Sequence, residues 1–117
     1  MSQSAGDCIF CKIVRKEIPA DTVYEDDHVL VFKDINPAAP VHLLLIPKKH
    51  VPTFFELEDG DGDVMGRLQL AAARVARELK LDDGFRLVSN CGKDAEQLVR
   101  HIHYHLLAGR PLKWPPG

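Results

Sequence analysis

Three histidines stand at every second position of the segment 100–109, "RHIHYHLLAG". In a β-strand, successive side chains point to opposite faces, so His101, His103 and His105 would share one face. A helix would spread the three rings over about 200°, at about 100° per residue. The Ile and Tyr between them and the two following Leu residues suit a half-buried strand, and "AGRP" then supplies a break. The spacing therefore predicts a strand with imidazoles on one face and core residues on the other.

Such a row of imidazoles has three interpretations. It could be a solvated polar face, although Thr, Ser or Gln would serve that purpose as well. It could bind a metal ion, because two histidines two residues apart on a strand can reach one ion. It could also act on a phosphate, because neutral imidazole is nucleophilic and a protonated neighbour stabilises phosphoryl oxygens. The preceding loop favours the phosphate, because Asn90, Gln97 and its backbone N–H groups are donors to an anion.

A second group of chemically active residues lies near the N-terminus, where "DCIFCK" places Cys8 and Cys11 in a C-x-x-C spacing. Two thiolates are only half of a structural zinc site, which usually has four ligands. The chain has 3 cysteines, an odd number that argues against a disulfide framework and for reduced thiols. The alternative is that the two cysteines are buried and simply pack.

Length, charge and hydropathy exclude several classes of protein. A chain of 117 residues is long enough to bury one core, so we expect a single domain over 1–117. The net charge of -2 gives no reason to expect nucleic acid as a partner. The longest apolar run, "VHLLLIP", is too short to cross a bilayer, and the start "MSQSAGDC" lacks the features of a signal peptide. We therefore expect a cytoplasmic protein with no membrane partner.

The rest of the chain predicts the elements that must position these residues. Apolar spacing indicates a short helix over 8–16 and a long one over 61–80. Strands are predicted over 22–24, 29–34, 41–49, 85–90 and the histidine segment. We expect residues 1–7 to be flexible and residues 108–117 to form an extended, proline-rich C-terminal tail. This pattern predicts an α+β fold, a five-stranded antiparallel sheet with one short and one long helix.

The histidine segment resembles the H-x-H-x-H-x-x signature of the histidine triad (HIT) family of nucleotide hydrolases and transferases. Three further stretches, "IFCKIVRKEIPA", "VYEDDHVLVFKDINPAAPVHLLLIPKKH" and "GRPLKWPPG", are similar to the branch called histidine triad nucleotide-binding proteins, which are purine nucleoside phosphoramidases. Their order and spacing match, and the resemblance spans nearly the whole chain. The uridylyltransferase branch carries Gln at the position of His105, so that branch is disfavoured. The resemblance implies a HIT-like fold.

The same resemblance implies roles for four histidines. His103 would be the nucleophile that attacks the α-phosphorus and forms a nucleotidyl-histidine, which water then hydrolyses. Its ring would be held in one tautomer by a hydrogen bond to a backbone carbonyl. His105 would contact the phosphate and help to protonate the leaving amine, and His42 would orient the network. His101 completes the triad.

A nucleoside pocket is implied as well, an apolar slot closed by a carboxylate that binds the ribose hydroxyls. The matching positions in this chain are Phe10, Ile18, Phe32, Asp34 and Ile35. For the four apolar residues, ordinary core packing is the alternative. Asn90 and Gln97 match donors on the phosphate side in the family, and solvation of a loop is their alternative.

One position departs from the pattern of this branch. Directly after the Gln that precedes the triad, where the branch often has Ser, this chain has Leu98. A hydroxyl donor is therefore missing, although the backbone N–H of Leu98 could replace it. We expect slower turnover or a shifted preference for the leaving group.

Bacterial members that carry the C-x-x-C are similar in holding a zinc ion. Its ligands there are the two cysteines, the histidine of "PKKH" and the first triad histidine, which in this chain are Cys8, Cys11, His50 and His101. The resemblance thus implies a structural Zn²⁺ and no catalytic metal. Buried cysteines that merely pack, with His50 on a solvated loop, remain the alternative.

Taken together, the resemblance implies a hydrolase that cleaves the P–N bond of purine nucleoside 5′-phosphoramidates, such as adenylylated amines. It also implies a homodimer. A second enzymatic hypothesis is the hydrolysis of dinucleoside polyphosphates. A non-enzymatic hypothesis, motivated by Leu98, is a zinc-stabilised nucleotide-binding or interaction module with weak activity.

Overall fold

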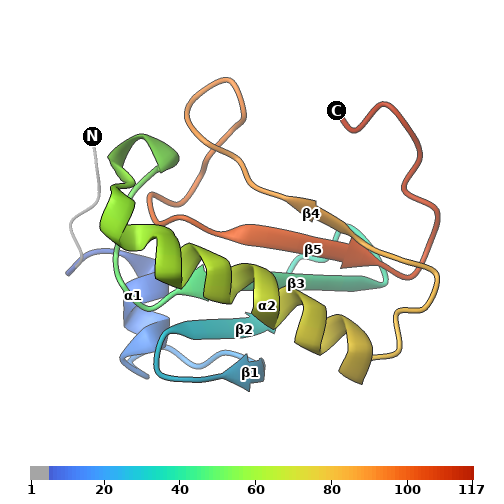
Figure 1. The fold of residues 1–117 in the computed structure, drawn as a ribbon, viewed down its shortest axis with the longest axis horizontal. Coiled ribbons are helices and arrows are strands. Elements are labelled where there is room, and N and C mark those ends of the chain that lie inside the picture. The colour runs from blue at the N-terminus through green and yellow to red at the C-terminus, as the bar shows by residue number, and fades with distance from the viewer. Residues whose placement is uncertain (1–5) are drawn as a thin grey trace.

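The computed structural model describes residues 6–117, so most of the segment predicted to be flexible, 1–7, lies outside the described residues. Within them the chain forms strands and α-helices in a mixed order, with two short 3-10 turns ahead of the long helix (Figure 1). The elements in chain order are α1 Ile9–Val14, β1 Thr22–Glu25, β2 Val29–Lys33, β3 Val41–Pro47, η1 Phe54–Glu56, η2 Asp59–Asp61, α2 Gly62–Glu78, β4 Arg86–Val88 and β5 Tyr104–Ala108.

A single antiparallel sheet organises the molecule, with its 5 strands in the order β1-β2-β3-β5-β4. Strands β3 and β5 are neighbours, although more than fifty residues separate them in the chain. The helix α2 runs along one face of the sheet (Figure 1). The short helix α1 packs on the other face. The predicted α+β architecture is thus confirmed.

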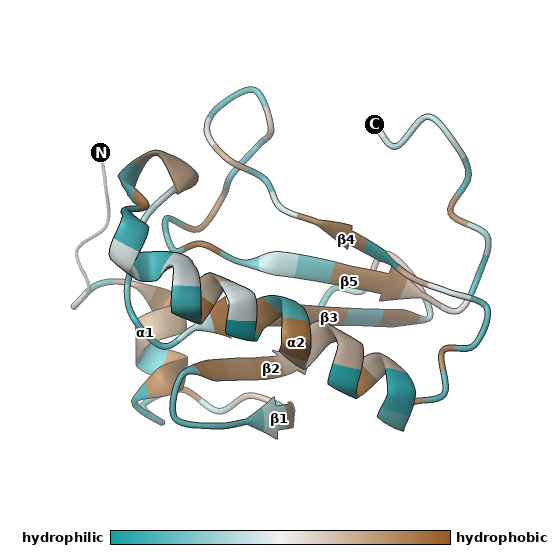
Figure 2. Cartoon of the chain, in the orientation of Figure 1, coloured by the Kyte–Doolittle hydropathy of each residue, from teal (hydrophilic) through white to brown (hydrophobic). Residues whose placement is uncertain are grey.

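Two apolar clusters lie on the two faces of the sheet, because alternate residues of a strand point to opposite sides. On β2, Val29 and Val31 pack under α2, whereas Leu30 and Phe32 pack against α1. Hydrophilic residues line the outer side of α2, and hydrophobic residues fill β2 (Figure 2). Leu44 and Ile46 of β3 belong to the same cluster as Phe10, so the α1 face continues from β2 onto β3.

The element boundaries differ from the predicted ones by a few residues. The long helix, predicted over 61–80, runs from Gly62 to Glu78. The strand predicted over 85–90 is limited to β4, and the strand predicted over 41–49 ends at Pro47. Ala108 belongs to β5, so the tail predicted to begin at residue 108 begins at Gly109. Within residues 6–117, no helix is long and apolar enough to cross a membrane.

The prediction of a strand through all three triad histidines is wrong for two of them. Only His105 lies in β5, because pairing with β3 ends at Leu45 opposite Tyr104. The chain that follows β3 turns away after Pro47, and the backbone N–H of Ile102 donates to the carbonyl of Val51 at 2.7 Å instead. His101 and His103 therefore precede the strand and are held by individual contacts.

Gly109 joins β5 to the tail, and it should be the glycine least tolerant of a side chain. Its φ is +95°, and an added Cβ would lie 2.8 Å from Cβ of Pro40. Gly84 has a similar φ of +101° but open space around it. We expect Gly84→Ala to lower the free energy of unfolding by about 1–2 kcal/mol. Gly109→Ala should lower it by about 1–3 kcal/mol more, because Pro40 must shift. Urea denaturation of both variants checks this, and equal losses would contradict it.

Candidate functional site

The ring of His103 is held in one orientation and one tautomer. Its Nδ1–H donates to the carbonyl oxygen of His101 at 2.7 Å. Because a carbonyl can only accept, the proton is on Nδ1 and the lone pair is on Nε2. Phe10 packs edge-on against this ring, with centroids 5.0 Å apart. The buried imidazole thus keeps one nitrogen available for chemistry.

Burial favours the neutral form of two triad rings that lie side by side. The centroids of His103 and His105 are 5.1 Å apart. Burial lowers the pKa of His103 below its ordinary value, partly opposed by its hydrogen bond to the His101 carbonyl. Burial, and then the neighbouring His103 and His42, lowers the pKa of His105 to about 4. A neutral imidazole is the nucleophilic form, so burial favours that form of both rings.

A second chain of hydrogen bonds joins His42 and His105. His105 pairs with Leu44 across the sheet, and His42 lies two residues earlier on β3, so the two rings share a face. The backbone N–H of Ala38 donates to Nδ1 of His42 at 2.9 Å. In the neutral ring the proton of His42 is therefore on Nε2, which lies 2.8 Å from Nδ1 of His105. His42 donates in that bond, and the proton of His105 is then on Nε2.

This chain of donors argues against a metal site at Asp34, His42 and His105, although their ligand atoms lie within 4.8 Å of one another. A metal ion needs the lone pair of Nε2 of His42, which would move the proton to Nδ1. There it would face the N–H of Ala38, donor against donor. The Asp34 carboxylate lies 3.4 Å from Nε2 of His42 instead and accepts the backbone N–H of Asn36. The three side chains are therefore linked by hydrogen bonds and a charge contact rather than arranged around an ion.

The Cys/His cluster, made of Cys8, Cys11, His50 and His101, has the geometry of a tetrahedral metal site. The Nδ1 atoms of His50 and His101 are 3.3 Å apart, and the three recorded sulfur to nitrogen distances are 3.2, 3.4 and 3.5 Å. A tetrahedral zinc ion with ordinary bond lengths sets these separations at about 3.3 Å and about 3.6 Å. The donor set therefore fits zinc.

A feature of the surroundings supports the same conclusion about the Cys/His cluster. Nε2–H of His101 donates to the carbonyl of Pro47 at 2.8 Å, so the lone pair of Nδ1 points into the cluster. Burial, followed by contact with Cys8, raises the pKa of the Cys11 thiol to about 11. A bound cation would lower that pKa and favour the thiolate. Both ring nitrogens of His101 are thus engaged, and only its carbonyl reaches His103.

An apolar cavity of about 180 Å³ lies on the α1 face. All five residues predicted to form a nucleoside pocket line it, together with Leu44 and part of α1: these are Phe10, Ile18, Phe32, Asp34 and Ile35. Ile35 is 91% exposed, so it is a rim residue rather than core. Asp34 joins this cavity to the histidines through its contact with His42.

The three residues predicted on the phosphate side lie in the loop 89–99 and do not line that cavity. The side-chain amide of Gln97 donates to the carbonyls of Pro52 and Val99 and accepts the N–H of Gly92. Donation to a phosphate would require one of these bonds to open. Asn90 donates to Ala95 and has a second N–H. Leu98 is 87% exposed. Their roles stay predictions.

Backbone groups fix the proton of three rings in the site: the carbonyls of His101 and Pro47 act on His103 and His101, and the N–H of Ala38 acts on His42. The resemblance implied a backbone carbonyl on the His103 ring, and the structure identifies it as that of His101. The other two groups were missed, because backbone atoms carry no residue signature. Ser89 was also missed, although its hydroxyl donates to the carbonyl of His103 at 2.8 Å.

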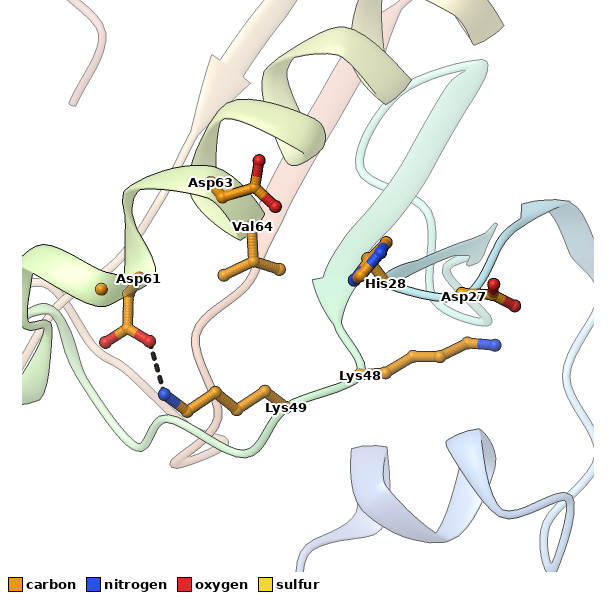
Figure 3. Close-up of a pocket in the computed structure, with 8 residues that line it drawn as sticks. Asp27, His28, Lys48, Lys49, Asp61, Asp63 and Val64 are labelled. Carbon is orange, nitrogen blue, oxygen red and sulfur yellow. Dashed lines mark hydrogen bonds and ion pairs between the residues drawn. The ribbon is translucent and has the colours of Figure 1, made fainter.

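A separate cavity of about 260 Å³ lies where α2 begins and has a different character (Figure 3). It is lined mainly by charged side chains, and Lys49 donates to Asp61 across it at 2.5 Å. Lys48 pairs with Glu25. Opposite charges therefore compensate one another there, and none of the triad histidines lines it.

Comparisons with known proteins agree with this geometry. Residues 15–112 match the family model described as HIT domain. A "14 kDa zinc-binding protein" from Brassica juncea is 51% identical over 95% of this chain and 100% of its own length. The crystal structure of a HIT family hydrolase from Legionella pneumophila is 47% identical, with a TM-score of 0.92 over 94% of this chain and 99% of that one. A histidine triad nucleotide-binding protein from Candida albicans is 33% identical, with a TM-score of 0.79 over 92% of this chain and 82% of that one.

Acid should destabilise the native protein more than the variant His105→Gln. The pKa of His105 falls from 6.5 to about 4 on folding, so between these values the unfolded chain binds more protons. Stability therefore falls as the pH drops from about 6.5 toward about 4. The variant lacks this imidazole, so its free energy of unfolding should fall less over the same pH range. Urea midpoints measured across this range check the difference, and equal slopes for the two proteins would contradict it.

Proposed function

The chain belongs to the HIT domain family, and from that premise we propose that it is a nucleotide hydrolase acting on the P–N bond of purine nucleoside 5′-phosphoramidates. The observation that carries the proposal is the state of His103. Its Nδ1 proton is held by the His101 carbonyl, and Nε2 is left with a lone pair beside His105. Similarity to a HIT family hydrolase and to a histidine triad nucleotide-binding protein supports it.

In the first step, Nε2 of His103 attacks the α-phosphorus, and the P–N bond to the amine breaks as the new bond forms. The carbonyl of His101 stabilises the positive charge that develops on the ring through the Nδ1–H bond. A nucleotidyl-histidine and an amine result. The amine needs a proton in order to leave.

The linked rings of His42 and His105 supply that proton. In the free protein burial keeps His105 neutral near pH 7. A bound phosphoryl anion favours the protonated form, so the pair takes up one proton with the substrate. His105 gives this proton to the amine and then, as a neutral base, accepts one from the water that attacks phosphorus. That second step breaks the bond to His103 and releases the nucleoside monophosphate.

The cavity on the α1 face is the proposed nucleoside site. Its apolar walls, which include Phe10 and Phe32, suit the faces of a purine. Asp34 lies at the end nearest His42, where a carboxylate can accept from two adjacent ribose hydroxyls. The ribose would thus bring its 5′-phosphoramidate toward His103.

Mass spectrometry after mixing the protein with adenosine 5′-phosphoramidate tests the nucleophile. We expect an adenylylated protein and released amine from the native chain. His103→Ala should abolish the adduct, because no other ring in the site offers a comparable free lone pair. His28→Ala, which removes a histidine outside the site, should leave the adduct unchanged.

The same experiment separates the alternatives. Faster turnover of diadenosine polyphosphates than of the phosphoramidate would replace the proposed substrate with P–O–P compounds. Nucleotide binding with neither adduct nor turnover would leave a binding module, the hypothesis that Leu98 motivates. An adduct that persists in His103→Ala would overturn the assignment of the nucleophile.

We further propose that the Cys/His cluster holds a structural zinc ion, which would tie α1 and the chain around His50 to His101. The cluster distances support it, as does similarity to the zinc-binding protein from Brassica juncea. Zinc takes no part in the steps above. The homodimer implied by the resemblance stays a prediction.

Elemental analysis of the purified protein checks the metal. We expect stoichiometric zinc in the native chain and a large loss in Cys8→Ser, because a ligand is removed. Cys91→Ser is the matched control, since Cys91 is a free cysteine outside the cluster. Zinc retained in Cys8→Ser, or absent from the native chain, would contradict the proposal.

A further inference from the structure

The main chain that carries the nucleophile lies outside the sheet. Pairing of β5 with β3 begins at Tyr104, and pairing with β4 begins at His105. His103 is thus the last residue before the strand and has no ladder partner among the described residues. Its backbone position must therefore depend on contacts other than the regular hydrogen bonds of the sheet.

One of these contacts comes from the residue that follows β4. The hydroxyl of Ser89 donates to the carbonyl oxygen of His103 at 2.8 Å. Ser89 comes directly after Val88, which pairs with His105, so the hydroxyl continues the attachment of β4 to β5 beyond the last ladder pair. A side chain here does what a backbone N–H does in the sheet.

The Ser89 hydrogen bond can affect the position of Nε2 of His103, because only a few covalent bonds connect the His103 carbonyl to its ring. The carbonyl of His103 belongs to the peptide plane that begins β5, and the orientation of that plane sets the direction of the bond from Cα to Cβ. At the other end, the ring is attached to the His101 carbonyl. With both attachments in place, Nε2 has a fixed position; without the first, the backbone can rotate and carry the ring with it.

We propose that Ser89 is a positioning residue for the nucleophile, acting through the carbonyl of His103. The inference rests on the proposed function for its chemical consequence. Misplacement of a reacting group by about 1 Å costs about a hundredfold in rate. Because the His101 carbonyl still holds the ring, we expect a smaller loss when the hydroxyl is removed.

A pair of isosteric variants isolates the hydroxyl. Ser89→Thr keeps it and Ser89→Val removes it, while both side chains have nearly the same shape and suit a strand end. In single-turnover reactions with adenosine 5′-phosphoramidate, Ser89→Val should form the adduct about fivefold to tenfold more slowly. Ser89→Thr should stay within about twofold of the native rate, and KM should change little in either variant, because the nucleoside cavity is untouched.

Tyr104→Phe is the matched control for loss of a nearby hydroxyl bond. The phenol of Tyr104 accepts from Gln69 of α2 at 2.9 Å, one residue from the nucleophile but on the opposite face. Its removal should leave the rate of adduct formation unchanged. If Tyr104→Phe slowed adduct formation as much as Ser89→Val, the effect would come from general destabilisation of β5, and the inference would be overturned.

Ring order, measured by NMR relaxation of the His103 Cε1–H group, tests the inference without substrate. It should be lower in Ser89→Val than in Ser89→Thr. Equal order and equal rates in the two variants would reject the role of Ser89. If the native chain forms no adduct, the proposed function fails, and the comparison of ring order still decides whether Ser89 holds the ring.

Discussion

The hydrogen bond from Nδ1 of His103 to the carbonyl of His101 is the contact on which the rest of the site depends. It determines which ring nitrogen carries the proton, and therefore which one keeps a lone pair that can act as a nucleophile. The same rule applies to its neighbours, since the carbonyl of Pro47 and the N–H of Ala38 fix the protons of His101 and His42. Backbone hydrogen bonds thus place the proton of chemically identical rings on different nitrogens, on Nδ1 in His103 and on Nε2 in His101 and His42.

These hydrogen bonds place the histidines in two separate environments, one with cysteines and one with another histidine and a carboxylate. Nδ1 of His101 faces two cysteines, and Nε2 of His42 faces another imidazole and a carboxylate. The first environment suits a metal ion, and the second suits proton transfer. His103 stands between them, attached to one group through a carbonyl and lying against the other through the ring of His105.

Much of the fold was predictable, because apolar periodicity depends on local chain geometry. The spacing of Leu68, Val75 and their neighbours places α2, and Cys8 and Cys11 do come together with His50 and His101 as the resemblance implied. The start of β5 was not predictable, because it depends on where the pairing between β3 and β5 ends, which is at Leu45 and Tyr104. The hydrogen bonds of the Gln97 side-chain amide could not be predicted for a similar reason, since their acceptors are main-chain carbonyls.

The helix α1 has only 6 residues, too few to be stable alone in water. Yet neighbouring residues at this helix contribute to two separate sites: the N-cap residue Cys8 and Cys11 enter the Cys/His cluster, while Phe10 and Ile13 form a wall of the cavity. The Cys/His cluster and the cavity therefore share one short helix. A protein engineer who wished to reshape this wall of the cavity would have to redesign the attachment of the helix at the Cys/His cluster at the same time.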